Sequence, residues 1–465
     1  MSILIIYSFW IFISEIRKNV FVGKVPRKIT MANTKVIAAV VVVIIVVAAA
    51  GAVVLLSSDS ESRSEEINLV LGLEQEGSGL FINEDDWSIS EFFEVDENGD
   101  IVTDDDGNAI YNAAGWGGKI IAVPTASSVQ FYQIKTIVES YLADESLVKD
   151  GETYDYTLKA WSSGSTLDSD EVGYIVIGSG AADNFLEYYN SVVDYDLGIT
   201  WYPQVAKITD QDRDDYETPF SLLATTNLLF PDQTCCVLYA NASYVSSNYS
   251  ESLRTVWAFK EAIDWINDAL AAGEDDPDNE DYQFLLEITA EVNGEGFTTD
   301  EVVESLKYVT YLWGYDSDDP LSKLKEDIAV QTEILDNIGG QLDYSVQDLG
   351  YDDYYDYASD FVDDSLIVDV LALDGEVPSW SETSDLSIAI ITQDMHNIAT
   401  YIAYTLLPGQ TETFFEQAGL NVTIIQVSGS GAVLTALKAN EADFGIAAQP
   451  AMIIDNINAK LTTAD

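Results

Sequence analysis

Polar and glycine-containing turns follow three short apolar runs near the C-terminal end of the chain. The runs cover residues 386–392, 421–427 and 443–447. The turns carry amide, carboxylate, imidazole and hydroxyl groups: Gln393, Asp394 and His396 after the first run, Ser428, Gly429, Ser430 and Gly431 after the second, and Gln449 after the third. Such groups hydrogen-bond small polar molecules, and Asp394 adds a negative charge. The turns therefore predict a site that binds a small molecule.

Helical patterns alternate with the three apolar runs, which is typical of βαβ units on a parallel sheet. In open α/β sheets, ligands bind outside the carboxyl ends of the strands, where helix N-termini direct N–H groups outward. We therefore expect residues 384–460 to form half of a binding cleft. Two of the polar residues also have plainer interpretations. Asp394 precedes a helical pattern and suits an N-cap, and His396 suits an ordinary first-turn residue.

The single histidine and the two cysteines give little basis for catalysis or for a metal site. Cys235 and Cys236 are adjacent, and neighbouring Cα atoms, about 3.8 Å apart, are closer than disulfides prefer. We expect two buried free thiols. A metal site needs more ligands than this pair offers, and the sequence contains no Ser/His/Asp arrangement, phosphate loop or zinc spacing. The sequence therefore predicts a protein that is not an enzyme and that holds no metal or cofactor.

The charge of the chain is strongly negative. There are 80 acidic and 20 basic side chains, a net charge of −60, although 47% of the residues are hydrophobic. Phosphate binding requires a basic surface, so this charge excludes nucleic acid as a partner. The apolar content is too high for a disordered acidic chain. A solvated acidic surface explains the charge, and adaptation to a salty medium is the alternative.

An uninterrupted apolar run, VIAAVVVVIIVVAAAGAVVLL, covers residues 36–56. At about 1.5 Å per residue it is long enough to cross a bilayer. Basic residues precede it and acidic residues follow it, so the positive-inside rule places the N-terminus in the cytoplasm. We expect residues 1–35 to be a cytoplasmic tail or a mis-assigned start, 36–56 a single-pass anchor in the cell membrane, and 57–66 a tether. A cleaved signal peptide is the alternative.

Two glycine pairs, Asn98-Gly99 and Asp106-Gly107, are typical of tight hairpin turns. The aspartates around them suggest a calcium loop, but the loop glycine is misplaced and no glutamate closes the loop. We therefore expect hairpins in this segment.

The C-terminal segment also resembles a known family. FFEQAGLNV, the Ser/Gly turn and AVLTALKANEADFGIAAQPA are similar to the opening of substrate-binding proteins of ABC importers, in the branch that serves sulfonates, taurine, nitrate and pyrimidine precursors. GKIIAVP, GITWYP and DFVDDSL resemble other segments of the same family. The resemblance implies an α/β, two-lobed periplasmic-binding-protein-like fold of type II that holds its ligand between the lobes.

The order of these segments differs from that of the family. The block that begins the mature family proteins ends this chain, and placing residues 384–465 before the strand at residue 67 restores the family order. We expect a circularly permuted fold with lobe 1 made of residues 67–117 and 236–465 and lobe 2 of residues 118–235. A truncated second copy is the alternative, but it would leave apolar parallel strands uncovered.

The resemblance assigns ligand-binding positions one by one. In the first lobe they are the residues of the three C-terminal turns: Gln393, Asp394, His396, Ser428, Gly429, Ser430, Gly431 and Gln449. In the second lobe they are Thr125, Ser127 and Ser128, with Trp201 and Tyr202 as walls. Trp201 equally suits a core residue, and Tyr202 stands where the family often has glutamate. These turns contain no arginine, so hydroxyls and helix N–H groups would hold a sulfonate or carboxylate. Asp394 would suit an ammonium group, which favours a zwitterion or an amine-bearing heterocycle.

The predicted function is therefore that of an extracellular, membrane-anchored solute-binding component of an ABC importer. Its ligand would be a sulfonate, an amino-sulfonate or a pyrimidine-like molecule, and its protein partners would be the permease and ATPase subunits. Two other classes stay open. The anchor and the acidic surface also suit an adhesin or structural surface protein, and the superfamily includes a pyrimidine-forming enzyme.

Overall fold

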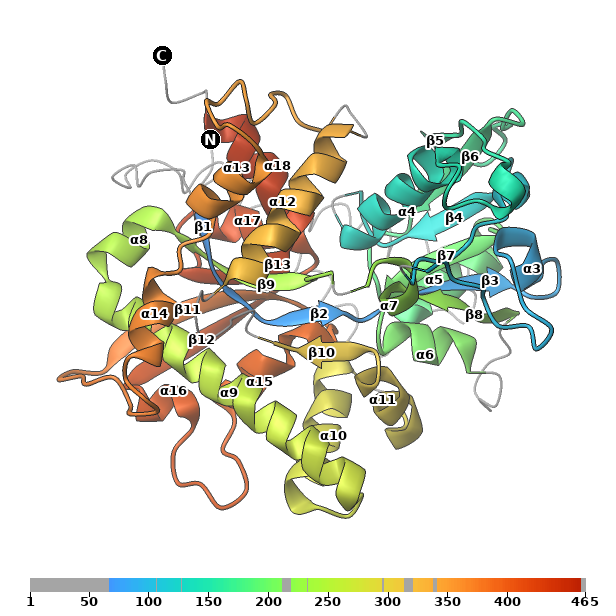
Figure 1. Ribbon diagram of the computed structural model, residues 1–465. Coiled ribbons are helices and arrows are strands. Elements are labelled where there is room, and N and C mark those ends of the chain that lie inside the picture. The colour runs from blue at the N-terminus through green and yellow to red at the C-terminus, as the bar shows by residue number, and fades with distance from the viewer. Residues whose placement is uncertain are drawn as a thin grey trace, which may run out of the picture. The chain divides into compact units, whose positions relative to one another are not determined.

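The computed structural model describes residues 67–460 except 106, 127, 211–218, 232, 295–296, 313–320 and 338–340. It contains a five-stranded, a six-stranded and a two-stranded sheet with helices packed on them (Figure 1). The α/β class predicted from the sequence is confirmed. The predicted tail, anchor and tether, residues 1–66, lie outside the described residues. Within the described part of the chain, no helix combines the length and the apolar character needed to cross a bilayer.

The five-stranded sheet joins the first described strand to the C-terminal strands. Its order is β1 (Ile67–Gly72), β9 (Cys236–Asn241), β13 (Phe444–Ala448), β11 (Ser384–Ile391) and β12 (Leu420–Val427). β11 pairs in parallel with β12 and β13, whereas β9 pairs antiparallel with β1 and β13. The three C-terminal strands lie where their apolar runs predicted them, to within two residues.

The six-stranded sheet contains the other strand-and-turn patterns. Its order is β5 (Thr157–Ala160), β6 (Glu171–Val176), β4 (Ile120–Val123), β7 (Leu197–Trp201), β3 (Ser78–Asn83) and β8 (Phe220–Thr225). β4 pairs in parallel with β6 and β7, and β3 pairs antiparallel with β7 and β8. The predicted strands that end before Thr125 and at Trp201 are therefore neighbours, because both belong to this parallel part of the sheet.

The chain passes between the two large sheets twice. It leaves β1 through β2 (Glu74–Glu76), which pairs with β10 (Val309–Tyr311), and it returns from β8 through α7 (Thr226–Leu229) to β9. The sheet membership of β3 differs from the predicted lobe boundary, which placed residues 67–117 with the C-terminal strands. β3 is buried along its whole length. Its apolar sequence marks a central strand but carries no information about which sheet it joins.

Helices flank both sheets. Those packed near the six-stranded sheet are α3 (Ile89–Phe92), α4 (Val129–Glu139), α5 (Ala182–Ser191) and α6 (Gln204–Thr209). The others are α8 (Ala242–Ser247), α9 (Tyr249–Asp275), α10 (Glu280–Asn293), α11 (Thr299–Leu306), α12 (Ser322–Asn337), α13 (Tyr354–Phe361), α14 (Ser365–Leu371), α15 (Ile398–Tyr404), α16 (Phe414–Gln417), α17 (Ser430–Lys438) and α18 (Gln449–Lys460). α17 packs on β11 and β13, and α18 packs on β13 and α12.

Local features predicted from the sequence are confirmed in several places. The sequence Thr298-Thr299-Asp300-Glu301 predicts a capping box, and Thr298 and Glu301 form one at the start of α11. Gly99 and Gly107 have φ angles of +91° and +89°, which suit the predicted hairpin turns. Gly375, Pro378 and Ser379 predict a linker over residues 374–383, and residues 376–383 form neither helix nor strand. Cys235 and Cys236 are buried and free.

The long helix α9 fastens the start of the C-terminal block to the rest of the chain. Its apolar stripe, which includes Val256 and Trp257, is buried against neighbouring helices. Arg254 on the same helix is 2% exposed. Its Nη1 donates to the carbonyl oxygens of Ala418 and Gly419 at 2.9 and 3.0 Å, and its Nη2 donates to Ser384 Oγ at 2.9 Å. One guanidinium therefore joins α9 to the beginnings of β11 and β12.

We expect Arg254→Ala to lower the free energy of unfolding by about 3 kcal/mol. The change removes the three charge-assisted hydrogen bonds described above, a fourth to the carbonyl oxygen of Ser250 and the ion pair with Glu251, and it leaves buried carbonyls without donors. Lys260→Ala, on the same helix, is the matched control. It removes the same charge, but Lys260 pairs with the more exposed Asp264, so we expect a loss below about 1 kcal/mol. Urea unfolding of both variants measures the difference. Equal losses would mean that net charge, and not the buried contacts, sets the effect.

Candidate functional site

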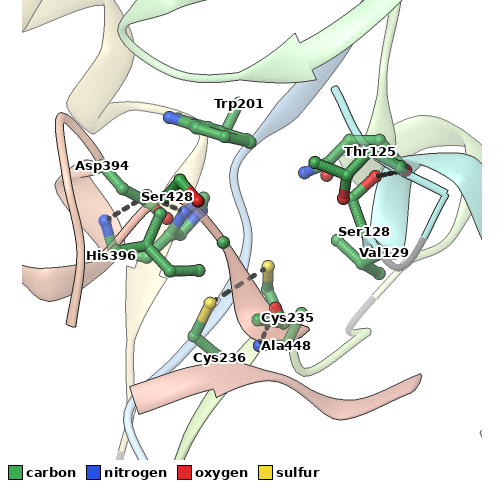
Figure 2. A pocket seen from close by; sticks show the side chains of 14 residues that line it. Thr125, Ser128, Val129, Trp201, Cys235, Cys236, Asp394, His396, Ser428 and Ala448 are labelled. Atoms are coloured by element: carbon green, nitrogen blue, oxygen red, sulfur yellow. Dashed lines mark hydrogen bonds and ion pairs between the residues drawn. The ribbon is translucent and has the colours of Figure 1, made fainter. Parts of the chain in front are cut away.

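A pocket lies where strands of both large sheets end (Figure 2). The space free of atoms at this pocket is about 350 Å³, much of which is open to solvent. Its lining comes from six segments. They are the turn after β4 with the first residues of α4, the end of β7, the start of β9, the end of β11 with the turn after it, the turn after β12 with the first residue of α17, and the end of β13. The lining residues used below are Thr125, Ser128, Trp201, Cys235, Cys236, Asp394, His396, Ser428, Gly429 and Ser430. Lysine and arginine are absent from the described lining residues.

The turn after β11 places a carboxylate and an imidazole at the pocket. Asp394 is 2% exposed and His396 is 1% exposed. Asp394 Oδ1 accepts a hydrogen bond from His396 N at 3.0 Å and lies 2.5 Å from His396 Nδ1. Asn397 Nδ2 donates to the carbonyl oxygen of Ile391, which ties the turn to the last residue of β11. Asp394 is therefore an N-cap, as its plainer interpretation predicted, and the same carboxylate orients the imidazole.

The N-terminus of α4 forms the opposite wall of the pocket. Ser128 Oγ accepts from Phe131 N at 3.2 Å and donates to the carbonyl oxygen of Thr125 at 2.9 Å. The Ser128 hydroxyl therefore caps α4 and closes the turn after β4. Ser127, the third predicted hydroxyl of this turn, lies outside the described residues.

Trp201 connects the end of β7 to the turn after β11. Its Nε1 donates to the carbonyl oxygen of Gln393 at 2.9 Å, and Gln204 Nε2 donates to the same oxygen at 3.2 Å. Gln393 has a φ of +55° and an exposed side chain, so its backbone is the part that faces Trp201. The Trp201 ring lines the pocket, in the position predicted for a wall of the site.

The remaining predicted residues divide into two groups. Ser428, Gly429 and Ser430 line the pocket, and Ser430 Oγ accepts from Ala448 N at 3.2 Å. Gly431, Gln449 and Tyr202 are not among the lining residues. Gln449 Nε2 donates to the carbonyl oxygen of Thr234 at 2.7 Å, and the Tyr202 ring stacks on Tyr308. Successive side chains at a strand end point to opposite sides, so Trp201 faces the pocket and Tyr202 does not.

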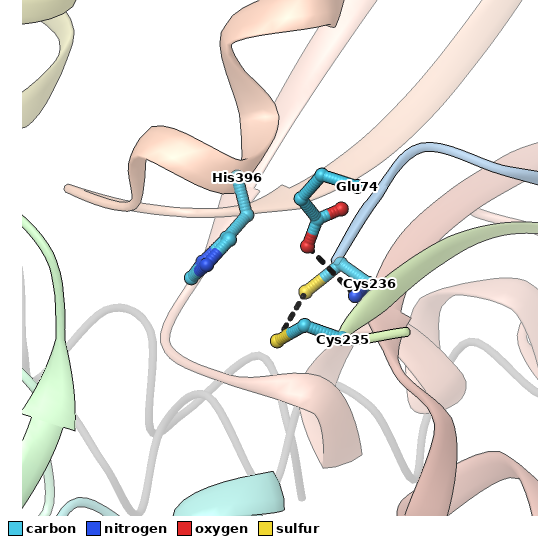
Figure 3. Close-up of side chains that lie close together, drawn as sticks. All are labelled: Glu74, Cys235, Cys236 and His396. Atoms are coloured by element: carbon cyan, nitrogen blue, oxygen red, sulfur yellow. Dashed lines mark hydrogen bonds between the residues drawn. The ribbon is translucent and has the colours of Figure 1, made fainter. Parts of the chain in front are cut away.

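The cysteine pair lies at the pocket, where sequence reasoning did not place it. Cys235 and Cys236 line it beside His396, and Glu74 from β2 approaches from the other side (Figure 3). Glu74 Oε1 accepts from Cys236 N at 2.8 Å. One ligand atom from each of Glu74, Cys235, Cys236 and His396 lies within 4.8 Å of the others. The sequence predicted too few metal ligands because it does not show that the fold brings the Glu74 carboxylate and the His396 imidazole to the cysteine pair. Adjacent cysteines were the only signal in the sequence.

Burial and mutual interaction change the pKa values of this group. Burial raises the pKa of Glu74 well above its usual value, although His396 acts in the opposite direction. Burial alone would lower the pKa of His396, but the charges of Asp394, Cys235 and Glu74 outweigh it and raise that pKa. The hydrogen bond between the thiols lowers the pKa of Cys235 and raises that of Cys236. The positions of these groups therefore favour a protonated, positively charged imidazole beside the acidic groups of Asp394, Cys235 and Glu74.

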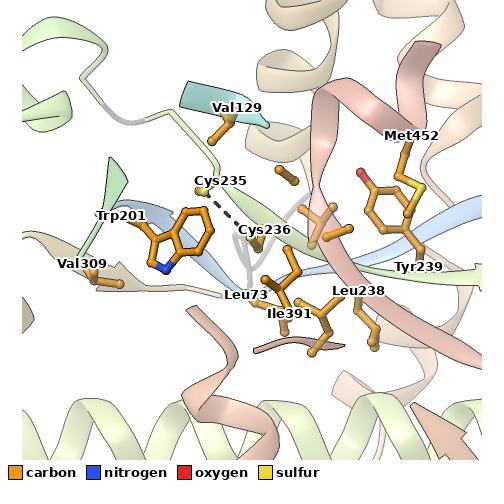
Figure 4. Packing of buried hydrophobic residues seen from close by; sticks show 14 of the residues in the cluster. Leu73, Val129, Trp201, Cys235, Cys236, Leu238, Tyr239, Val309, Ile391 and Met452 are labelled. Atoms are coloured by element: carbon orange, nitrogen blue, oxygen red, sulfur yellow. Dashed lines mark hydrogen bonds between the residues drawn. The ribbon is translucent and has the colours of Figure 1, made fainter. Parts of the chain in front are cut away.

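Apolar side chains enclose this polar group. Leu73, Val309 and Ile391 are buried around the cysteines and Trp201, and Leu238 and Tyr239 continue the core along β9 (Figure 4). Few water molecules can screen charges in such surroundings, so the electrostatic interactions among the polar groups are stronger than on the surface.

Residues 403–459 match the family model described as NMT1/THI5 like. This is a family of ABC-type substrate-binding proteins. The matched segment runs from α15 to α18 and includes the pocket turn with Ser428, Gly429 and Ser430. No curated protein and no solved structure matches the chain. The predicted resemblance is thus supported over the C-terminal block.

We expect Gly77→Ala to be strongly destabilising, because a Cβ there would lie 2.5 Å from His396 Nε2 and 2.6 Å from Val309 Cγ2. Gly99→Ala is the matched control, since Gly99 has a similar positive φ but open space around its Cβ position. Gly99→Ala should cost about 1 kcal/mol of unfolding free energy, and Gly77→Ala at least about 2 kcal/mol more. Chemical denaturation compares the two, and equal costs would show that the site tolerates displacement of His396.

Proposed function

We propose that this chain is the solute-binding component of an ABC importer and that it binds a small organic molecule in the pocket without converting it. The observation that carries the proposal is the lining of the pocket, which comes from the carboxyl ends of β4 and β7 in one sheet and of β11 and β12 in the other. Ligands of α/β proteins bind at such strand ends. The match of residues 403–459 to a family of substrate-binding proteins supports the same role.

We further propose a two-lobed type II fold that is circularly permuted. The sheet memberships suggest one lobe made of residues 67–77 and 236–460 and another made of residues 78–235. β9 pairs with β1 on one side and β13 on the other, so the C-terminal block and the first described strand share one sheet. A truncated second copy would have no reason to complete that sheet. Opening and closing of the two lobes would admit and retain the ligand.

The ligand class follows from the groups at the pocket. With hydroxyls, backbone N–H groups and a buried carboxylate, the pocket suits a small zwitterion, such as an amino-sulfonate, or an amine-bearing heterocycle. Asp394 Oδ1 is engaged with His396. An ammonium group would therefore bind through the other oxygen of that carboxylate. Gln393, Gln449, Gly431 and Tyr202 are left as weaker contributors, and the contact predicted for Ser127 stays a prediction.

The proposed setting is the outer face of the cell membrane, with residues 36–56 as a single-pass anchor and the ABC permease and ATPase subunits as partners. The apolar run of the N-terminal segment and the acidic surface support this setting. An anchor would keep the binding protein close to its permease in a cell that lacks a closed periplasm.

We expect saturating taurine to raise the melting temperature of the purified chain more than ethanesulfonate does, because only taurine offers an ammonium group to Asp394. Uracil tests the heterocyclic alternative. Calorimetry then gives the affinities. Equal binding of the two sulfonates would refute the role of Asp394 and leave the transport role intact. Binding by none of the three would contradict the proposed ligand class, and conversion of a ligand would replace transport by an enzymatic function.

The hydroxyl of Ser428 provides a second test. We expect Ser428→Ala to weaken binding of whichever of these ligands binds by about 5- to 15-fold, the effect of one lost hydrogen bond. Ser246→Ala, on the exposed face of α8, is the control and should leave affinity unchanged. If both variants bind like the parent chain, the ligand does not occupy this pocket.

A further inference from the structure

We propose that Glu74, Cys235, Cys236 and His396 form a binding site for one thiophilic divalent metal ion of the Zn²⁺ type. This site goes beyond the proposed transport function and does not depend on the identity of the solute. The four side chains come from three separate parts of the fold: β2, the start of β9 and the turn after β11. Their convergence is a property of the tertiary structure.

The spacing of the two sulfur atoms matches a tetrahedral site. Cys235 Sγ and Cys236 Sγ lie 3.8 Å apart. Two Zn–S bonds of about 2.3 Å at a tetrahedral angle also place the sulfurs about 3.8 Å apart. All the ligand atoms lie within 4.8 Å of one another. The carboxylate and imidazole therefore need to approach by no more than about 1.5 Å to complete the tetrahedron.

Glu74 provides an observation that points independently to a cation. Its side chain is 1% exposed, and among the described residues its Oε2 has no hydrogen-bond partner. Its other oxygen, Oε1, accepts from Cys236 N. A buried carboxylate oxygen without a donor is costly, and a metal ion bound to it would remove that cost.

The imidazole is held as metal-binding histidines usually are. Asp394 engages Nδ1 of His396, so the ring would coordinate a metal through Nε2. A carboxylate behind the imidazole fixes its orientation and strengthens it as a ligand. The backbone of Gly77 lies close to Nε2, because a Cβ at position 77 would lie only 2.5 Å from that nitrogen, so a larger residue there would displace the imidazole.

The chemistry of the ligand set selects the kind of metal. Two sulfurs, one nitrogen and one carboxylate oxygen favour Zn²⁺ or Co²⁺, whereas Mg²⁺ and Ca²⁺ require sets made of oxygen. Binding would release the thiol protons and the Nε2 proton of the imidazole, and the charge of the ion would offset the negative charge that is buried here. Both cysteines and the histidine line the pocket, which gives the ion a path from solvent.

The test uses the purified full chain, freed of metal and reduced, and titrated with Co²⁺ and Zn²⁺ in excess Mg²⁺. Excess Mg²⁺ occupies surface carboxylates, which are abundant in this chain. We expect one tightly bound ion per chain and a thiolate-to-Co²⁺ charge-transfer absorption band that Zn²⁺ displaces. No band, or more than one weakly bound ion without thiolate absorption, would overturn the proposal.

Variants assign the ligands. Glu74→Gln and His396→Gln should each weaken Zn²⁺ binding at least about 10-fold, and Asp394→Asn should weaken it about 10- to 100-fold through the imidazole. The double variant Cys235→Ser with Cys236→Ser should lose the Co²⁺ band. Asp196→Asn, which removes a carboxylate outside the group, is the control and should bind Zn²⁺ normally. Unchanged Zn²⁺ affinity in the cysteine variant would refute the site.

A measurement on the unmodified chain decides the question if a variant fails to fold. Zn²⁺ should slow alkylation of the two thiols by iodoacetamide at least about 10-fold, and a chelator should reverse the protection. Alkylation that is unaffected by Zn²⁺ would overturn the proposal. Solute binding is titrated separately with and without Zn²⁺, so failure of the metal site and failure of the transport role are distinguishable.

Discussion

The pairing of β9 with two strands that lie far apart in the chain is the constraint on which the rest of the structure depends. β9 is antiparallel to β1 on one side and to β13 on the other. Backbone hydrogen bonds therefore bring the first described strand and the C-terminal block into one sheet. The same pairing brings the cysteines that start β9 close to Ala448 at the end of β13. The pocket exists because this strand joins segments more than two hundred residues apart.

Hydrogen bonds to neighbouring side chains and backbone groups stabilise the buried polar groups at the pocket. Asp394 accepts from His396, Glu74 accepts from the backbone of Cys236, and Ser128 caps α4 with its hydroxyl. Each contact offsets part of the cost of removing a polar group from water. Their positions are set by strand ends and helix starts, where backbone groups lack partners within their own element. The same side chains therefore line the binding pocket and stabilise the fold around it.

Charge has one role at the acidic surface, where it sets the long-range field, and another in the interior, where single basic side chains make local contacts. The net charge of −60 produces a field that repels anions and attracts cations. Within the fold, the few basic side chains have specific structural roles: Arg254 joins α9 to the starts of β11 and β12, and the Lys119 ammonium lies over the Trp87 ring. An anionic group would thus reach the pocket against the overall field, whereas an ammonium group or a metal ion would approach with it.

The sequence by itself determined the local elements. Apolar runs marked β11, β12 and β13, the capping box marked α11, and the turns that bear Asp394, His396 and Ser428 were placed at strand ends, because these features depend on residues close together in the chain. Only the tertiary structure decided which sheet β3 joins, that Trp201 faces the pocket while Tyr202 packs on Tyr308, and that Glu74 and His396 meet Cys235 and Cys236. Those outcomes depend on strand pairing between distant segments, and periodicity and turn chemistry carry no information about such pairing.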